Sequence, residues 1–134
     1  MTSPSLELQG AIVARMKAFV DLTGLIDDRI YDRVPAEPAF PYVSWGPEQS
    51  VADDADCITG FEVFLQIDAW SRAVGFPEVK RVAEAVRAAL HQYELPLADN
   101  ALVSLEHRQT RFFRDPDGLT SHAVIEIVAL VEQP

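Results

Sequence analysis

Histidine is the side chain most often used for acid–base catalysis and for zinc binding, and this chain has three. His91 falls in a helical pattern, whereas His107 and His122 fall in two strands joined by a turn. A turn centred between residues 116 and 117 does not place His107 directly opposite His122. No third ligand or oriented nucleophile accompanies them. We interpret all three as surface or interface residues, with a zinc or catalytic pair as the alternative.

Asp53, Asp54 and Asp56 form a second candidate site, because carboxylates are the ligands that calcium prefers. Their spacing lacks the alternating ligands, the central glycine and the terminal glutamate of an EF-hand loop. The single cysteine, Cys57, follows directly, and like-charge repulsion from these carboxylates disfavours its thiolate. One cysteine allows neither an intramolecular disulfide nor a thiolate metal cluster. We therefore predict no metal site and an unreactive thiol.

No other pattern in the sequence supplies catalytic groups. The serines lack the context of a nucleophile elbow, and the glycines do not form a phosphate-binding loop. We assign no catalytic residue, expect no cofactor, and predict that the protein is not an enzyme.

Arg108, Arg111 and Arg114, together with Phe112 and Phe113, form a basic and aromatic cluster. Such clusters bind nucleic acids in some proteins and are enriched at protein interfaces in others. The net charge is −10, from 21 acidic against 11 basic residues, which opposes binding to phosphates. A protein contact is therefore the favoured interpretation, with nucleic acid as the alternative.

The elements that position these residues are clearest between residues 60 and 90. One side of a strand is formed by alternating apolar residues, and a helix with apolar positions at helical spacing follows from about Pro77 to Gln92. The strand residues are Phe61, Val63, Leu65, Ile67 and Ala69.

The rest of the chain predicts a helix from Ser3–Pro4 to Gly24, short strands at 30–34 and 42–45, and an exposed acidic loop or flexible hairpin tip at about 46–60. Residues 101–132 predict a long hairpin around a turn at 114–118. The order is α-β-β-β-α-β-β. The fold class is α+β, with a mixed or antiparallel sheet of about five strands and two helices packed on one face.

The face of this sheet turned away from the helices is too apolar to be fully solvated. It would either curl on itself or meet another subunit. Phe64 and Trp70 are its aromatic members, and the rest of the predicted face consists of Glu62, Gln66, Asp68, His122, Val124, Glu126, Val128 and Leu130.

Length and composition set the remaining expectations. The 134 residues predict one domain, 1–134, and 49% hydrophobic with 24% charged residues is typical of a folded protein. No segment reads as a secretory signal or a membrane span, so we expect an intracellular protein.

Four segments resemble the tail terminator (tail completion) proteins of long-tailed phages and gene transfer agents. They are RIYDRVP (29–35), FPYVSW (40–45), LQIDAWSR (65–72, leading to a helix ending in VRAAL at 86–90) and RFFRDPDG (111–118). The match in element order covers nearly the whole chain.

The resemblance implies a non-enzymatic particle component that forms a homo-oligomeric ring, a hexamer, at the head-proximal end of a tail tube. The ring would end tube polymerisation and join the tail to the neck. Its partners would be the tail tube protein and a neck or head–tail connector protein, with DNA passing through its channel without specific binding. Assembly would take place in the cytoplasm, before the protein becomes part of the particle.

Two sets of residues are expected to serve this role. Asp53, Asp54 and Asp56 would face the channel or the neighbouring ring. The subunit or tube interface would contain Phe64, Trp70, Arg108, Arg111, Phe112, Phe113 and Arg114. A head–tail connector or stopper protein is the nearest alternative, and a small cytosolic ligand-binding protein is an alternative of another class.

Overall fold

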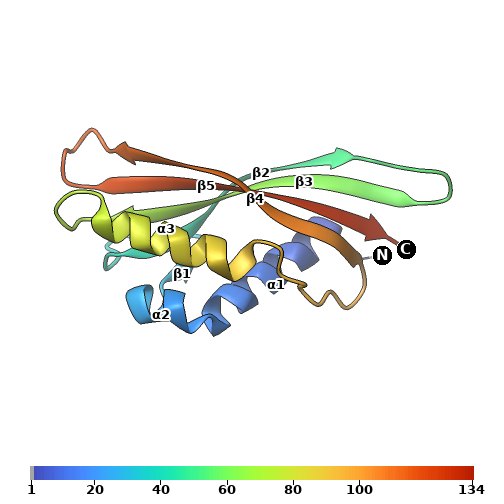
Figure 1. Cartoon of the computed structure of the whole chain (residues 1–134), viewed down its shortest axis with the longest axis horizontal. Helices are drawn as coiled ribbons and strands as arrows, with labels where there is room; N and C mark the ends of the chain where they lie inside the picture. The colour runs from blue at the N-terminus through green and yellow to red at the C-terminus, as the bar shows by residue number, and fades with distance from the viewer. Residues whose placement is uncertain (1) are drawn as a thin grey trace.

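The alternating apolar residues of 61–69 form the central strand of a five-stranded sheet. The computed structural model describes residues 2–134 and places three helices on one face of this sheet (Figure 1). The elements are α1 (Pro4–Ala18), α2 (Val20–Ile26), β1 (Ile30–Tyr31), β2 (Tyr42–Ala52), β3 (Thr59–Ser71), α3 (Pro77–Leu90), β4 (Ala101–Arg114) and β5 (Ser121–Gln133). The α+β fold class is confirmed, with three helices in place of the two expected.

The strand order is β1-β2-β3-β5-β4, so the last strand lies inside the sheet between β3 and β4. All neighbours are antiparallel except β1 and β2, which makes the sheet mixed. The predicted hairpin of residues 101–132 is present as β4 and β5. Val63, Leu65, Ile67 and Ala69 of β3 are buried beneath the helices, as their alternation predicted.

The predicted first helix is divided in two. Ser3 caps its start, where the Leu6 N–H donates to Ser3 Oγ at 3.3 Å, and Leu8, Ile12 and Met16 are fully buried. Phe19 then takes an extended conformation and ends α1. Placing the end of the helix at Gly24 was wrong, because α2 continues through it to Ile26. This second segment turns Leu22 and Ile26 into the core, and their burial outweighs the helix-weakening effect of glycine.

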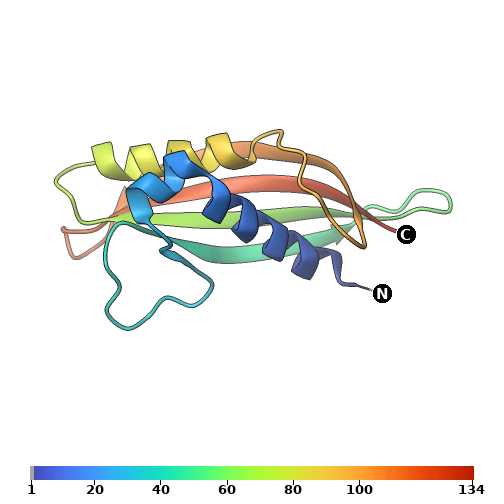
Figure 2. The ribbon, with the colours of Figure 1, turned by 90° about the horizontal axis from the view of Figure 1, so that it is seen from below.

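The predicted helix after Pro77 is present as α3 and ends at Leu90 rather than Gln92. Its apolar stripe is fully buried against the sheet. Figure 2 shows α1 and α3 crossing the same face, with the connection of residues 32–41 projecting from the body. The strand predicted at 30–34 is shortened to the two residues of β1, because Pro35, Pro38 and Pro41 punctuate this connection. None of the helices in residues 2–134 is long and apolar enough to cross a bilayer.

The segment predicted as a loop at 46–60 is largely strand. β2 continues to Ala52 and β3 starts at Thr59, so only residues 53–58 connect them. Gly46 and Pro47 do not interrupt the strand; they form a bulge, where a proline without an N–H is tolerated. The exposed residues 47–59 are here called the hairpin arm. Its end, where residues 53–58 connect the two strands, projects beyond the rest of the sheet (Figure 1).

A second bulge lies in β4, across the sheet from the bulge in β2 and at the same level along the strands. The β2 bulge separates Trp45, paired with Ile67, from Glu48, paired with Leu65, and so lies opposite Gln66. Strand β4 has one irregularity between Leu102 and Ser104 and another, here called the β4 bulge, between His107 and Gln109. Gln109 pairs with Glu126, and Glu126 is itself the partner of Gln66. Bulges bend strands and increase their twist. The strands β2 and β4, on either side of the β3–β5 pair, are therefore both bent at the level of Gln66 and Glu126.

Glu7 fastens α1 to the segment that leads into β4. The N–H groups of Asp99 and Asn100 each donate to its carboxylate at 2.9 Å, and Asn100 Nδ2 donates at 3.1 Å. Desolvation raises the pKa of Glu7, but these hydrogen bonds outweigh it, and the net pKa lies below the ordinary value of a glutamate. The helix layer and the edge strand are thus joined by a charged acceptor.

We expect Gly46→Ala to lower the free energy of unfolding by about 1–3 kcal/mol, the range for forcing an atom into a packed site. A Cβ at this position would lie 2.6 Å from Asp68 Oδ2 and 2.9 Å from the backbone oxygen of Gln66. Denaturant unfolding measures the change. The control is Gly10→Ala in α1, where a Cβ meets nothing within 4 Å and is expected to stabilise by up to ~1 kcal/mol. Equal stabilities of the two variants would contradict a bulge that requires glycine.

Candidate assembly surface

The face of the sheet opposite the helices, here called the helix-free face, carries a row of rings that crosses every strand. Tyr31 of β1, Tyr42 of β2, Trp70 of β3, His122 of β5 and Phe113 of β4 follow one another in strand order. Neighbouring ring centroids are 5.7, 6.2, 3.7 and 6.2 Å apart along this row. Trp70 and His122 are stacked with 9° between their planes. Cross-strand aromatic pairs stabilise a sheet, and surfaces of this kind are common in interface cores.

A buried carboxylate fixes the centre of this row. Asp68 is 6% exposed, and its Oδ1 lies 2.7 Å from His122 Nε2 and 2.9 Å from Gln66 Nε2. This bond places a proton on Nε2 and orients the imidazole against Trp70. Trp70 Nε1 donates to Ser44 Oγ at 2.9 Å. No buried side-chain nitrogen or oxygen of residues 2–134 lacks a hydrogen-bond partner, as burial requires.

A hollow of about 280 Å³ lies on the same face at the level of the two bulges, separated from the row by Asp68 and Val124. Phe64 and Val128 supply its apolar surface, and Arg108 stands over the Phe64 ring with its guanidinium carbon 5.9 Å from the centroid. Arg108 is the extra residue of the β4 bulge and is exposed. The hollow thus combines an apolar floor with a cation on its rim.

The residues predicted as an interface divide between the two faces. Phe64, Trp70, Arg108, Arg111 and Phe113 lie together on the helix-free face. Arg111 Nε is 3.8 Å from Glu126 Oε2, and its guanidinium carbon is 5.5 Å from the centroid of the Phe113 ring.

Phe112 and Arg114 lie on the other side. Phe112 packs 6.3 Å from Phe76, beside α3, and the Arg114 guanidinium stands 4.2 Å above the Phe76 ring. The alternation of a strand separates neighbours in this way. The basic and aromatic cluster read from the sequence is therefore two clusters.

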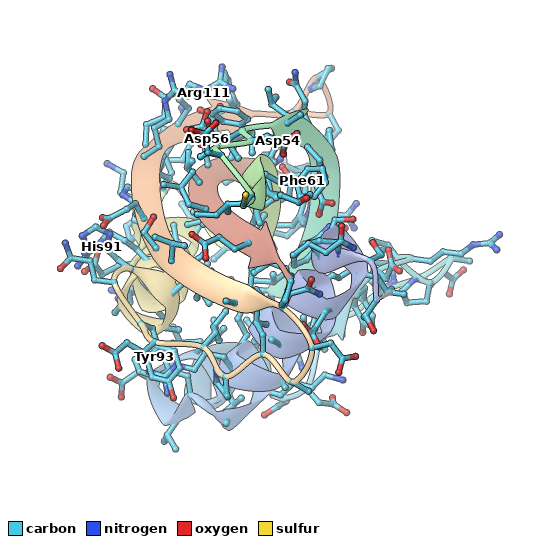
Figure 3. All side chains as sticks on the ribbon, turned by 90° about the vertical axis from the view of Figure 1, so that its right-hand side faces the viewer. Asp54, Asp56, Phe61, His91, Tyr93 and Arg111 are labelled. Carbon is cyan, nitrogen blue, oxygen red and sulfur yellow. The ribbon has the colours of Figure 1, made fainter. Side chains whose placement is uncertain are left out.

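The acidic residues lie at the tip of the hairpin arm. Ala55 and Ile58 exchange backbone hydrogen bonds of 3.1 and 2.9 Å around a two-residue turn, in which Cys57 has a φ of 62°. Asp54 Oδ1 accepts from the Gly60 N–H at 3.0 Å, so this carboxylate stabilises the tip itself. Figure 3 shows Asp54, Asp56 and Arg111 on the side of the molecule away from α1. Asp53 and Asp56 are exposed.

The structure places His107 beside His91 and His122 in the aromatic row. His107 pairs with Ile127 and His122 with Phe113, so the two are not opposite each other. The His107 N–H instead donates to His91 Nδ1 at 3.0 Å. Desolvation, followed by Arg87 and His91, lowers the pKa of His107. Across residues 2–134, no group of three or more potential ligands is arranged to hold a metal ion.

The Asp68–His122–Trp70 cluster was not predicted as a unit. The alternating pattern does assign all three residues to the helix-free face. Their contact depends on the register between β3 and β5, in which Trp70 pairs with His122 and Asp68 with Val124. That register joins strands far apart in the chain and has no signal in a single sequence.

Comparisons with known proteins agree with this geometry. The sequence profile of the family described as Tail completion protein gp17 matches residues 10–132. A chain from a structure titled "Virion of native gene transfer agent (GTA) particle" superposes with a TM-score of 0.91 and 28% sequence identity, covering 98% of this chain and 99% of that chain. Among curated proteins, none matches significantly.

We expect His122→Ala to lower the free energy of unfolding by about 1–3 kcal/mol, because it removes a partner from a buried carboxylate. A double-mutant cycle with Asp68→Asn measures the coupling by chemical unfolding. The loss caused by His122→Ala should be smaller in the Asp68→Asn background. The same loss in both backgrounds would show that the two side chains are not energetically coupled.

Proposed function

Because the chain belongs to the Tail completion protein gp17 family, we propose that it forms a ring at the head-proximal end of a tail tube, ends tube polymerisation and joins the tail to the neck. Family membership and the likeness to a gene transfer agent virion chain identify a structural component of a phage-type tail, part of a phage-like particle and not an enzyme.

The observation that supports a ring is the helix-free face. Three helices cover one side of the sheet (Figure 1). On the other side the hollow is open, Phe113 is exposed, and Trp70 and His122 are partly exposed, although Tyr42 of the same row is buried. Copies that close into a ring contact each other through two different patches, and a sheet with one covered and one open face offers two such patches. We propose a hexamer, with Phe64, Trp70, Arg108, Arg111 and Phe113 in the contact with the next subunit or the tube. Phe112 and Arg114 contribute on the side of α3.

The partners in this proposal are the tail tube protein on one side of the ring and a neck or head–tail connector protein on the other. The ring assembles in the cytoplasm and then becomes part of the particle. DNA crosses the channel without specific binding, and the net charge of −10 per copy supports this because an acidic wall repels phosphates.

We also propose that the tip residues Asp53, Asp54 and Asp56 face the channel or an adjoining ring. Their exposure on a projecting arm supports both placements, since the arm reaches beyond the rest of the subunit (Figure 1).

Tail tube protein polymerised with and without this protein tests the proposed activity. We expect tubes to stop growing when it is present, and gold-labelled protein to appear in electron micrographs at one tube end as a six-fold ring. A protein that binds only the neck complex, with tube length unchanged, would support a connector or stopper instead. Label along the tube wall would contradict termination.

Neutralising the tip tests its role. In particles carrying Asp53→Asn, Asp54→Asn and Asp56→Asn together, we expect impaired assembly or DNA delivery, because three charges are removed while an amide oxygen at position 54 can still accept from the Gly60 N–H. The control changes three exposed acids elsewhere, with Asp21→Asn, Asp28→Asn and Glu94→Gln, and alters the net charge equally. Unchanged assembly and unchanged delivery in the first variant would remove the tip from both roles.

A further inference from the structure

Charge is divided unevenly between two parts of the sheet. Residues 34–71, which contain β2, the hairpin arm and β3, have no lysine or arginine. Strand β4, at the far edge of the sheet, carries three arginines against one glutamate. The charge therefore changes along the strand order, from the acidic strands β2 and β3 to the basic edge strand β4. The acidic residues of 34–71 are Glu37, Glu48, Asp53, Asp54, Asp56, Glu62 and Asp68.

The hollow on the helix-free face lies between these two parts: residues 47–49 and 64–66 line it from the acidic part, and Arg108 of β4 is its one basic lining residue. Arg108 at its rim forms no ion pair with any carboxylate of residues 2–134, and its nearest recorded partner is the ring of Phe64. Glu126 also lines the hollow, but it accepts from Gln109 and lies 3.8 Å from Arg111, which offsets its charge. The hollow offers an unpaired cation above an apolar floor.

The tip of the hairpin arm has the complementary chemistry. Ile58 is 44% exposed, although isoleucine is among the residues most often buried. Asp56 precedes it by two residues at the turn, and its side chain makes no hydrogen bond within the described chain. The tip is narrow, being only a two-residue turn between paired strands. Ile58 and Asp56 thus lie two residues apart in this tip, where Ile58 also borders a hollow lined by Phe61 and Val103 of its own chain.

The tip cannot occupy the hollow of its own subunit. Ile58 and Phe64 lie on the same strand or its immediate extension, six residues apart, and a strand rises about 3.3 Å per residue. The separation is about 20 Å along a hydrogen-bonded ladder that cannot fold back on itself. Only another molecule can place such a tip there.

We propose that the tip of one copy docks into the hollow of a second copy, with Ile58 against Phe64 and Val128 and with Asp56 facing Arg108. The contact joins two different patches of the same chain, so each copy can bind the next one. A closed ring forms when the rotation between neighbouring copies brings the last copy back to the first. The inference rests on the proposed ring and specifies one of its contacts. It assigns the acidic tip to an adjoining subunit, whereas the ring alone leaves it free to line the channel.

Two single-cysteine proteins test the contact, because Cys57 at the tip is the only native cysteine. One is the unmodified chain, and the other carries Cys57→Ser with Gln109→Cys beside the hollow. Rings formed from their mixture on tail tubes are oxidised and separated without reductant. We expect a disulfide between the two proteins. The control protein carries Cys57→Ser with Arg81→Cys, at an exposed position of α3. It should give roughly tenfold less of the disulfide-linked dimer.

Charge reversal provides the second arm of the experiment. Asp56→Arg in both proteins, or Arg108→Asp in both proteins, should reduce the cross-linked fraction roughly tenfold. Both substitutions together in both proteins should restore it. Asp28→Arg, an exposed acid of the helix side, should leave it unchanged.

The outcomes separate this contact from the proposed function. Rings that cap tubes without the disulfide, or with no response to charge reversal, would overturn the contact and leave the function intact. A disulfide to the tube protein in place of a second copy would also overturn it. Failure to bind tubes or form rings would overturn both.

Discussion

The arrangement of the helix-free face depends on two bulges at one level of the sheet. The strands β2 and β4, which flank the central pair of β3 and β5, carry one or two extra residues opposite the Gln66–Glu126 pair. The β2 bulge is possible because Gly46 brings its backbone within a distance of Asp68 and Gln66 that no side chain would allow. The β4 bulge turns Arg108 toward Phe64. The hollow and the cation on its rim follow from these two irregularities.

The same face is neither a second core nor an ordinary solvent surface. A core would exclude the carboxylate of Asp68, and a solvated surface would not need to pair it with both His122 and Gln66. The rings of Trp70 and His122 remain partly exposed around this buried pair. Polar groups that are satisfied internally leave the apolar parts of the rings available for contact, since a partner covering them displaces little bound water. This is the character expected of a surface that another protein covers.

The local sequence pattern predicted most helices and strands. The features that it did not predict depend on packing and pairing between segments far apart in the chain. The alternation of residues 61–69 identified β3 because one face of that strand is buried along most of its length. The predicted ends of the first helix at Gly24 and of the strand before Gly46–Pro47 were wrong. Tertiary packing keeps α2 and β2 intact through residues that weaken a helix or a strand in isolation. The aromatic row and the hollow join four or five strands, and neither strand order nor register is encoded in local periodicity. The residue types of the site were therefore predictable, whereas their grouping was not.

The distribution of charge connects this geometry with the proposed channel for DNA. A protein of net charge −10 still exposes Arg108 and Arg111 on its open face, and these would attract phosphates if they lined the channel. Pairing Arg108 with an acidic tip from the next copy removes a cation from the solvent-accessible surface and leaves the net charge unchanged. The acidic excess of each copy would then dominate the field outside the contacts. The proposed subunit contact and the proposed repulsion of DNA would then both follow from the separation of acidic and basic residues within the chain.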